Sequence, residues 1–126
     1  MMNNTRVYNQ WLNGLGPFDF PIIFPREVEI TKIVINWPQG SHDEDTVAVF
    51  ANEDVSFENG VPIGTINFAT QFENIVLTPA QSIDSNQILV FDNINWVGRR
   101  FRFVGDWQSY NVGNPALINV FWRFTT

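Results

Sequence analysis

The residues that could perform acid–base chemistry are few and lie in one short segment. The chain has a single histidine, His42, and the acidic run 43–45 follows it directly. A catalytic triad needs a nucleophile placed beside such a histidine, and no G-x-S-x-G nucleophile elbow is present. The P-loop, dinucleotide-binding and H-E-x-x-H patterns are absent as well. We therefore expect His42 to be a solvated loop residue and the protein to have no enzymatic activity.

The same segment supplies the candidate metal ligands. Asp43 and Asp45 precede a predicted strand and Asp54 follows it, so that three carboxylates offer the hard oxygen ligands that Ca²⁺ prefers. Their spacing does not match an EF-hand loop, so only the fold could bring them together. The alternative, which we favour, is an exposed acidic loop that keeps the domain soluble. No cofactor is then expected, and calcium is the one metal that the sequence leaves open.

Aromatic and arginine side chains gather between residues 95 and 110 and form a candidate surface for a ligand or partner. Aromatic rings exposed in loops stack on sugar rings, and guanidinium groups bind hydroxyls, carboxylates or acidic side chains of a partner. The alternative, which we favour, is that the rings close an open end of the core while the arginines pair with local acids. The residues concerned are Trp96, Arg99, Arg100, Arg102, Trp107 and Tyr110.

The first 25 residues are predicted to form an extended apolar segment outside the main run of strands. Apolar residues recur at every second position from Phe18 to Phe24 with prolines between them, which is typical of an edge strand or an extended arm. The segment either covers the core of its own domain, which we favour, or packs on a neighbouring subunit of an oligomer or coat. Its candidate contact residues are Tyr8, Trp11, Phe18 and Phe20.

The rest of the chain has the periodicity of strands and almost none of helices. The parity of the apolar positions changes between Ile30 and Ile33, which predicts a bulge or bend at Thr31–Lys32. Further short apolar runs, separated by Gly, Pro, Asn and Asp, bring the total to about eight strands. We therefore predict one all-β domain over residues 1–126, an antiparallel β-sandwich or jelly roll, with a closed barrel as the alternative.

Composition limits the class of partner. The formal net charge is -6, and an acidic domain repels nucleic acid and anionic lipid at long range. The absence of cysteine excludes disulfides and thiolate chemistry. No apolar run approaches the ~18 residues of a membrane span, and the start of the chain lacks the apolar region of a signal peptide. We expect a protein without nucleic-acid or membrane partners, located in the cytoplasm unless it belongs to a virus particle.

Three segments resemble galactose-binding-like (discoidin-type) jelly-roll domains. Residues 27–35 and 46–54 resemble an early hairpin of that family, and residues 98–104 resemble a later strand. The resemblance implies a non-enzymatic domain that binds glycans, lipid headgroups or proteins through loops at one end. Domains of this kind also resemble accessory and decoration modules of bacteriophage virions. The common pair of cysteines of the family is missing here, and its glycan-binding loops have no residue-by-residue match.

These observations lead to one expected function and one alternative. We expect a structural or binding protein of a phage virion, such as a capsid decoration or minor tail protein, that acts through protein–protein contacts. Its partners would be other virion proteins or further copies of itself in a homo-oligomer. The alternative is a carbohydrate-binding module that holds a glycan with its loop aromatics and arginines.

Overall fold

The computed structural model describes residues 4–12, 16–37, 40–41, 46–51, 57–58, 61–62, 70–76, 82–83, 87–107 and 116–126. All regular structure in these ranges is β-strand, which confirms the prediction of an all-β antiparallel class. The strands are β1 (Arg6–Leu12), β2 (Gly16–Trp37), β3 (Gly40–Ser41), β4 (Thr46–Ala51), β5 (Phe57–Glu58), β6 (Val61–Pro62), β7 (Thr70–Val76), β8 (Ser82–Ile83), β9 (Gln87–Phe91), β10 (Trp96–Trp107) and β11 (Ala116–Phe124).

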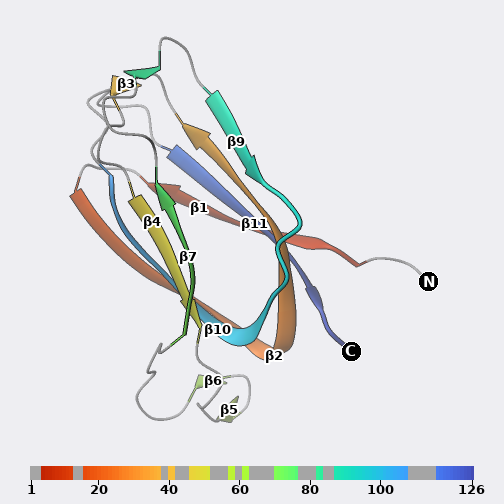
Figure 1. Ribbon diagram of the computed structural model, residues 1–126. Helices are drawn as coiled ribbons and strands as arrows, with labels where there is room; N and C mark the ends of the chain where they lie inside the picture. Colours follow the sequence, from red (N-terminus) through yellow and green to blue (C-terminus); the bar gives the residue numbers. More distant parts are fainter. Residues whose placement is uncertain are drawn as a thin grey trace.

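One large antiparallel sheet organises the described residues. Its strand order is β1-β11-β2-β10-β4-β7, and β9 also pairs with β2, whereas β3-β8 and β5-β6 form two small ribbons. Strands β2 and β10 bend strongly, so that the sheet curves back over itself (Figure 1). The sheet is therefore continuous through its bent strands, and the sandwich and the count of eight strands stay predictions.

Strand β2 is 22 residues long and belongs to both halves of the bent sheet. Its first half, residues 16–23, pairs with β10, whereas residues 28–37 are flanked by β11 on one side and by β9 and the start of β10 on the other. Pro17 and Pro21 lie in the first half, where the described residues place no strand on the other side. Proline cannot donate to a second ladder, so it is tolerated at such an edge. The prediction of an edge strand at this place is confirmed.

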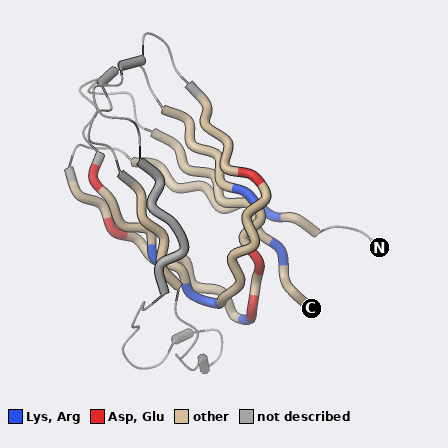
Figure 2. The backbone as a smooth tube through the Cα atoms, in the orientation of Figure 1, with Lys and Arg blue, Asp and Glu red and all other residues tan. Residues whose placement is uncertain are grey.

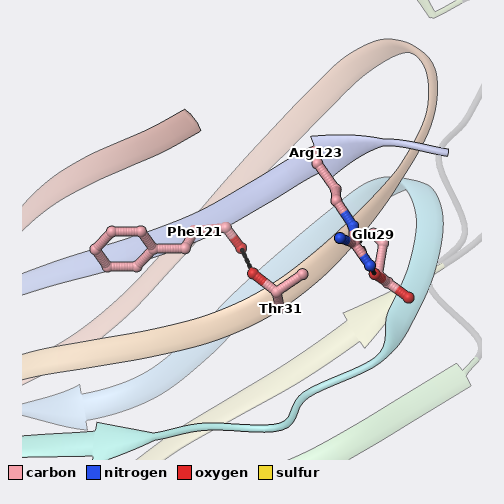
Figure 3. Close-up of polar contacts among 4 residues, drawn as sticks. All are labelled: Glu29, Thr31, Phe121 and Arg123. Carbon is pink, nitrogen blue, oxygen red and sulfur yellow. Dashed lines mark hydrogen bonds and ion pairs between the residues drawn. The ribbon is translucent and has the colours of Figure 1, made fainter. Parts of the chain in front are cut away.

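A bulge lies in the middle of β2, as the change of apolar parity predicted. Phe121 of β11 pairs with Lys32, but the next residue, Trp122, pairs with Ile30, so Thr31 has no counterpart on β11. The Thr31 hydroxyl lies 3.4 Å from the carbonyl oxygen of Phe121 and donates to it (Figure 3). The extra residue lets the apolar side chains before and after it face the same side of the sheet.

The connection between β9 and β10 lies beside the same bulge, on the edge of β2 that faces away from β11. Residues 92–95 leave the strand conformation there, and the backbone N–H of Ile94 donates to the carbonyl of Thr31 at 3.0 Å. Asn93 has a φ of 58°, a left-handed conformation that asparagine tolerates better than most residues. The Asp92 carboxylate accepts the N–H of Asn93 at 2.9 Å and stabilises this turn.

Both halves of the sheet contribute to one hydrophobic core. Strands β2 and β11 supply the inward side chains of one half, and β4 and β10 supply those of the other. The described strands among the first 25 residues belong to this sheet, because residues 6–12 pair with β11 and residues 16–23 pair with β10. The buried apolar residues are Leu12, Ile22, Phe24, Val28, Ile30, Ile33, Ile35, Trp37, Val47, Val49, Ala51, Ile94, Trp96, Phe101, Phe103, Ala116, Ile118 and Val120.

Candidate functional site

The arginine-rich segment predicted as a binding surface lies inside β10, and most of its described side chains are engaged within the sheet. Trp96 belongs to the strand rather than to a turn, and its ring is part of the core. Arg100 is fully buried, the one buried charged side chain among the described residues. Arg99 donates from Nη2 to the carbonyl oxygen of Pro25 at 3.2 Å. Trp96 and Arg100 are thus buried and Arg99 bonds to the backbone, while the choice between a binding surface and a structural role for the whole segment stays a prediction.

Arg102 makes a two-pronged ion pair across the sheet with Asp19 of β2. Its Nε donates to Oδ1 at 2.9 Å and its Nη2 to Oδ2 at 2.6 Å. The hydrogen bonds from Arg102, assisted by its charge, lower the pKa of the Asp19 carboxyl, and slight desolvation opposes them. The same hydrogen bonds raise the pKa of Arg102. Both side chains are about half exposed, so the pair is screened by water and holds neighbouring strands together only weakly.

Several predicted site residues lie outside the part of the chain whose side chains are described. Trp107 is the last residue of β10, where only its backbone is placed, and Tyr110 lies in an undescribed range. The histidine and the calcium candidates Asp43, Asp45 and Asp54 lie in undescribed ranges as well. Within the described ranges, no group of three or more His, Cys, Asp or Glu side chains is close enough to hold a metal ion. The calcium site stays a prediction.

The four predicted contact residues near the N-terminus divide into two groups. Tyr8, Phe18 and Phe20 are partly buried and pack against the core, where the ring of Phe20 stacks on that of Phe103 with centroids 5.1 Å apart. Trp11 instead is 51% exposed and points away from the core, because it alternates with the buried Leu12. Among these four, Trp11 is the one exposed side chain.

Trp11 is part of a broad apolar surface on the outer side of β1, β11, β9 and the second half of β2. The core positions of these strands face inward, so the alternate positions face away from the core. We call this surface the outer face, and it consists of Val7, Asn9, Trp11, Lys32, Val34, Asn36, Ile88, Val90, Leu117, Asn119 and Phe121.

Strong exposure of large apolar side chains marks the outer face. The exposed fractions are 48% for Val7, 62% for Ile88 and 56% for Val90, besides the 51% of Trp11. The remaining exposed large apolar side chain in the described residues is Val97, at 39%, which pairs with Glu29 and faces the same side of the sheet just beyond the outer face. Isolated exposed apolar residues are ordinary, but a contiguous patch marks a contact surface.

The polar groups of the outer face are amides and one ammonium group. Asn119 Nδ2 donates to Asn9 Oδ1 at 2.6 Å, and Asn36 Nδ2 donates to Asn119 Oδ1 at 3.4 Å. The Lys32 ammonium lies 4.5 Å from the centroid of the Phe121 ring, a cation–π distance. The asparagines therefore form a ladder across β1, β11 and β2 within an apolar surrounding.

Lys32 is the only charged residue of the outer face, and other charged residues occur along the tube beyond its ends (Figure 2). At one end Arg123 of β11 pairs with Glu29 of β2, with Nη2 and Oε1 2.7 Å apart (Figure 3). Past this pair, the side chains of Arg6 and Arg26 lie over the ring of Phe124, with guanidinium-to-centroid distances of 5.4 and 3.8 Å. These cation–π contacts cover aromatic rings that pack against the edge of the core.

Sequence reasoning did not find the outer face as a whole. The signal was present in the runs Ile88–Phe91 and Leu117–Phe121, which are apolar at almost every position instead of alternating with polar residues. Such runs are typical of strands that are covered on both faces. In both runs one face contacts the core, whereas the other face is exposed in β9 and half-buried in β11.

Comparisons of this chain with family models, with curated proteins and with solved structures found no match. The resemblance to galactose-binding-like jelly rolls therefore stays a prediction. Within the described residues, no helix has the length and apolar character needed to cross a membrane.

Proposed function

We propose that the protein is a non-enzymatic structural module that acts through protein–protein contacts, and that the outer face is its contact surface. The observation that supports this function is the exposure of Trp11, Val7, Ile88 and Val90 together on one sheet face. The arginines and Trp96, which would serve a glycan site, are engaged within the sheet among the described residues. Protein contact is therefore the function that the geometry favours.

The size of the outer face agrees with a contact surface. Adjacent strands lie about 4.8 Å apart and residues about 3.3 Å along a strand, so four strands over five residues cover about 19 by 17 Å, or roughly 320 Å². This footprint falls in the range of about 300–600 Å² of the largest patches on monomers, which are often functional. The amides add hydrogen-bonding groups that fix orientation within an apolar contact.

The setting that we propose is a phage virion, in which the protein would be a capsid decoration or minor tail component. This setting is supported by the resemblance to virion accessory modules and by the absence of recognisable catalytic motifs in the sequence. Genes beside this one are then expected to encode capsid or tail proteins. Neighbours that encode only metabolic or secretion functions would contradict the setting.

The experiment is sedimentation of particles from the native source in a density gradient. We expect the chain to sediment with capsids or tails, and Val90→Lys to reduce its occupancy on the particles at least tenfold. The matched control is Val104→Lys, because Val104 is a half-buried valine that faces outward on the other half of the bent sheet, between Asp19 and Ala48, and the change in charge is the same. A chain that never sediments with particles, or two variants with equal occupancy, would overturn the proposed function.

A further inference from the structure

We propose that the outer face binds the outer face of a second copy of this chain and forms a two-fold symmetric dimer. This inference rests on the proposed function, because it identifies the first occupant of the same surface. Its basis is the order in which apolar and polar side chains follow one another on the face.

The register of the strands arranges the outer face in three rows that run across the sheet. Each row joins residues that pair on adjacent strands. Row one contains Trp11, Leu117, Asn36 and Ile88, row two contains Asn9, Asn119, Val34 and Val90, and row three contains Val7, Phe121 and Lys32.

A two-fold axis that lies in the interface along row two places row one of each copy over row three of the other. Trp11 of β1 then lies over Val7 of the second copy, because both belong to the same strand. On β11, Leu117 lies over Phe121 in the same way. Apolar side chains thus meet apolar side chains at these positions, as an isologous interface requires.

The polar positions match under the same axis. On β2, Asn36 lies over Lys32 of the second copy, so that an amide oxygen can accept a hydrogen bond from the ammonium group. The amides of row two face the same amides of the second copy, and an amide both donates and accepts. A surface of this kind is complementary to itself, whereas a charged surface needs a partner of the opposite charge.

Charge favours this face over other surfaces for self-association. The chain has a formal net charge of -6, so two copies repel each other in general. The residues of the outer face include no carboxylate. Of the two described carboxylates beside it, Glu29 is paired with Arg123, and Asp92, which directly follows β9, accepts the N–H of Asn93. The two Lys32 side chains do not meet, because row three lies over row one. Contact through this face therefore keeps like charges apart.

The area predicts a reversible dimer. The accessible surface of projecting side chains exceeds the flat footprint, so two outer faces would bury on the order of 1,000 Å² in total. This value lies at the lower end of specific interfaces. A dissociation constant in the micromolar range is expected, on the order of 1–100 μM.

The test is sedimentation velocity of the purified full chain from about 1 to about 300 μM, which brackets the expected dissociation constant. We expect a shift from one chain to two as the concentration rises. Val90→Lys places two ammonium groups against each other on the axis and should weaken the dimer about 100-fold. Val104→Lys adds the same charge on the other half of the bent sheet and should leave the dimer unchanged.

A second variant tests the orientation of the two copies. Asn36→Asp places a carboxylate over Lys32 of the second copy, twice in each dimer, and should tighten the dimer about fivefold at low salt. The tightening of the dimer should disappear in high salt. At low salt it is expected even though the added carboxylate makes each chain more acidic. Failure of Asn36→Asp to tighten the dimer would overturn the proposed axis.

The remaining outcomes separate this inference from the proposed function. A wild-type chain that stays monomeric up to the highest concentration would overturn the dimer, and so would a dimer that only Val104→Lys disrupts. In either case a loss of particle occupancy with Val90→Lys would still support the outer face as a contact surface for another protein. Circular dichroism spectra equal to that of the wild type would show that each variant is folded.

Discussion

Deletion of Thr31 is expected to leave the fold intact, because the bulge holds one residue more than the ladder needs. With Thr31 removed, Ile30 and Lys32 become consecutive while keeping their partners Trp122 and Phe121 on β11. Ile33 then faces the core by regular alternation. The chain loses a bend and local hydrogen bonds, and the pairing on either side is preserved.

The cost of this deletion follows from the contacts of Thr31. Its carbonyl accepts the N–H of Ile94, a buried residue, and leaving a buried N–H without a partner costs about 1–3 kcal/mol. The hydroxyl bond to Phe121 is long, at 3.4 Å, and contributes at most about 1 kcal/mol. We therefore expect a loss of about 1–4 kcal/mol in the free energy of unfolding.

Deletion of Val34, three residues further along the same strand, is the matched control. Removal of Val34 shifts the alternation of β2 by one residue. If the residues before the deletion keep their partners on β11, Ile35 and Trp37 turn outward. If the residues after it keep theirs, the bulge is lost, Ile33 becomes exposed and Lys32 becomes buried. Each large side chain lost from the core costs about 1.5–3 kcal/mol, and burial of a polar group adds to this. The sum, about 5–9 kcal/mol, is comparable to the whole stability of a domain of this size, about 5–15 kcal/mol.

Urea unfolding followed by circular dichroism and tryptophan fluorescence distinguishes the two deletions. The chain without Thr31 should unfold cooperatively at a lower urea concentration than the wild type. The chain without Val34 should show no cooperative transition. Equal damage by both deletions, or a less stable chain after removal of Thr31 than after removal of Val34, would refute the role assigned to the bulge.

Two further predictions concern the arginine-rich strand and its neighbouring loop. The folded-state pKa of Asp19 is lowered, so its pair with Arg102 contributes stability above the unfolded-state pKa and loses it as the pH falls through the folded-state pKa. The difference in unfolding free energy between wild type and Asp19→Asn should thus be largest near neutral pH and shrink in acid, and a difference independent of pH would contradict this. On a glycan array the protein is expected to bind no sugar. Binding that Trp107→Ala removes would support the carbohydrate-binding alternative instead.

The sequence by itself determined the local geometry of this protein. Alternation of apolar residues follows directly from the pleat of a strand, so the strands and the change of parity at Thr31 were visible without a structure. The prolines of β2 identified an edge for the same kind of reason, because a residue without an N–H cannot join a second ladder. These features depend on each residue and its immediate neighbours in the chain.

Only the tertiary structure decided which side of each strand became the core. Ile118 and Phe121 are both large and apolar, and alternation alone cannot say that Ile118 is buried while Phe121 lies on the outer face. The partners of the arginines are also non-local: Arg102 finds Asp19 from 83 residues away. The physical reason is that burial and pairing depend on which distant strands lie side by side, and that arrangement is a property of the whole sheet.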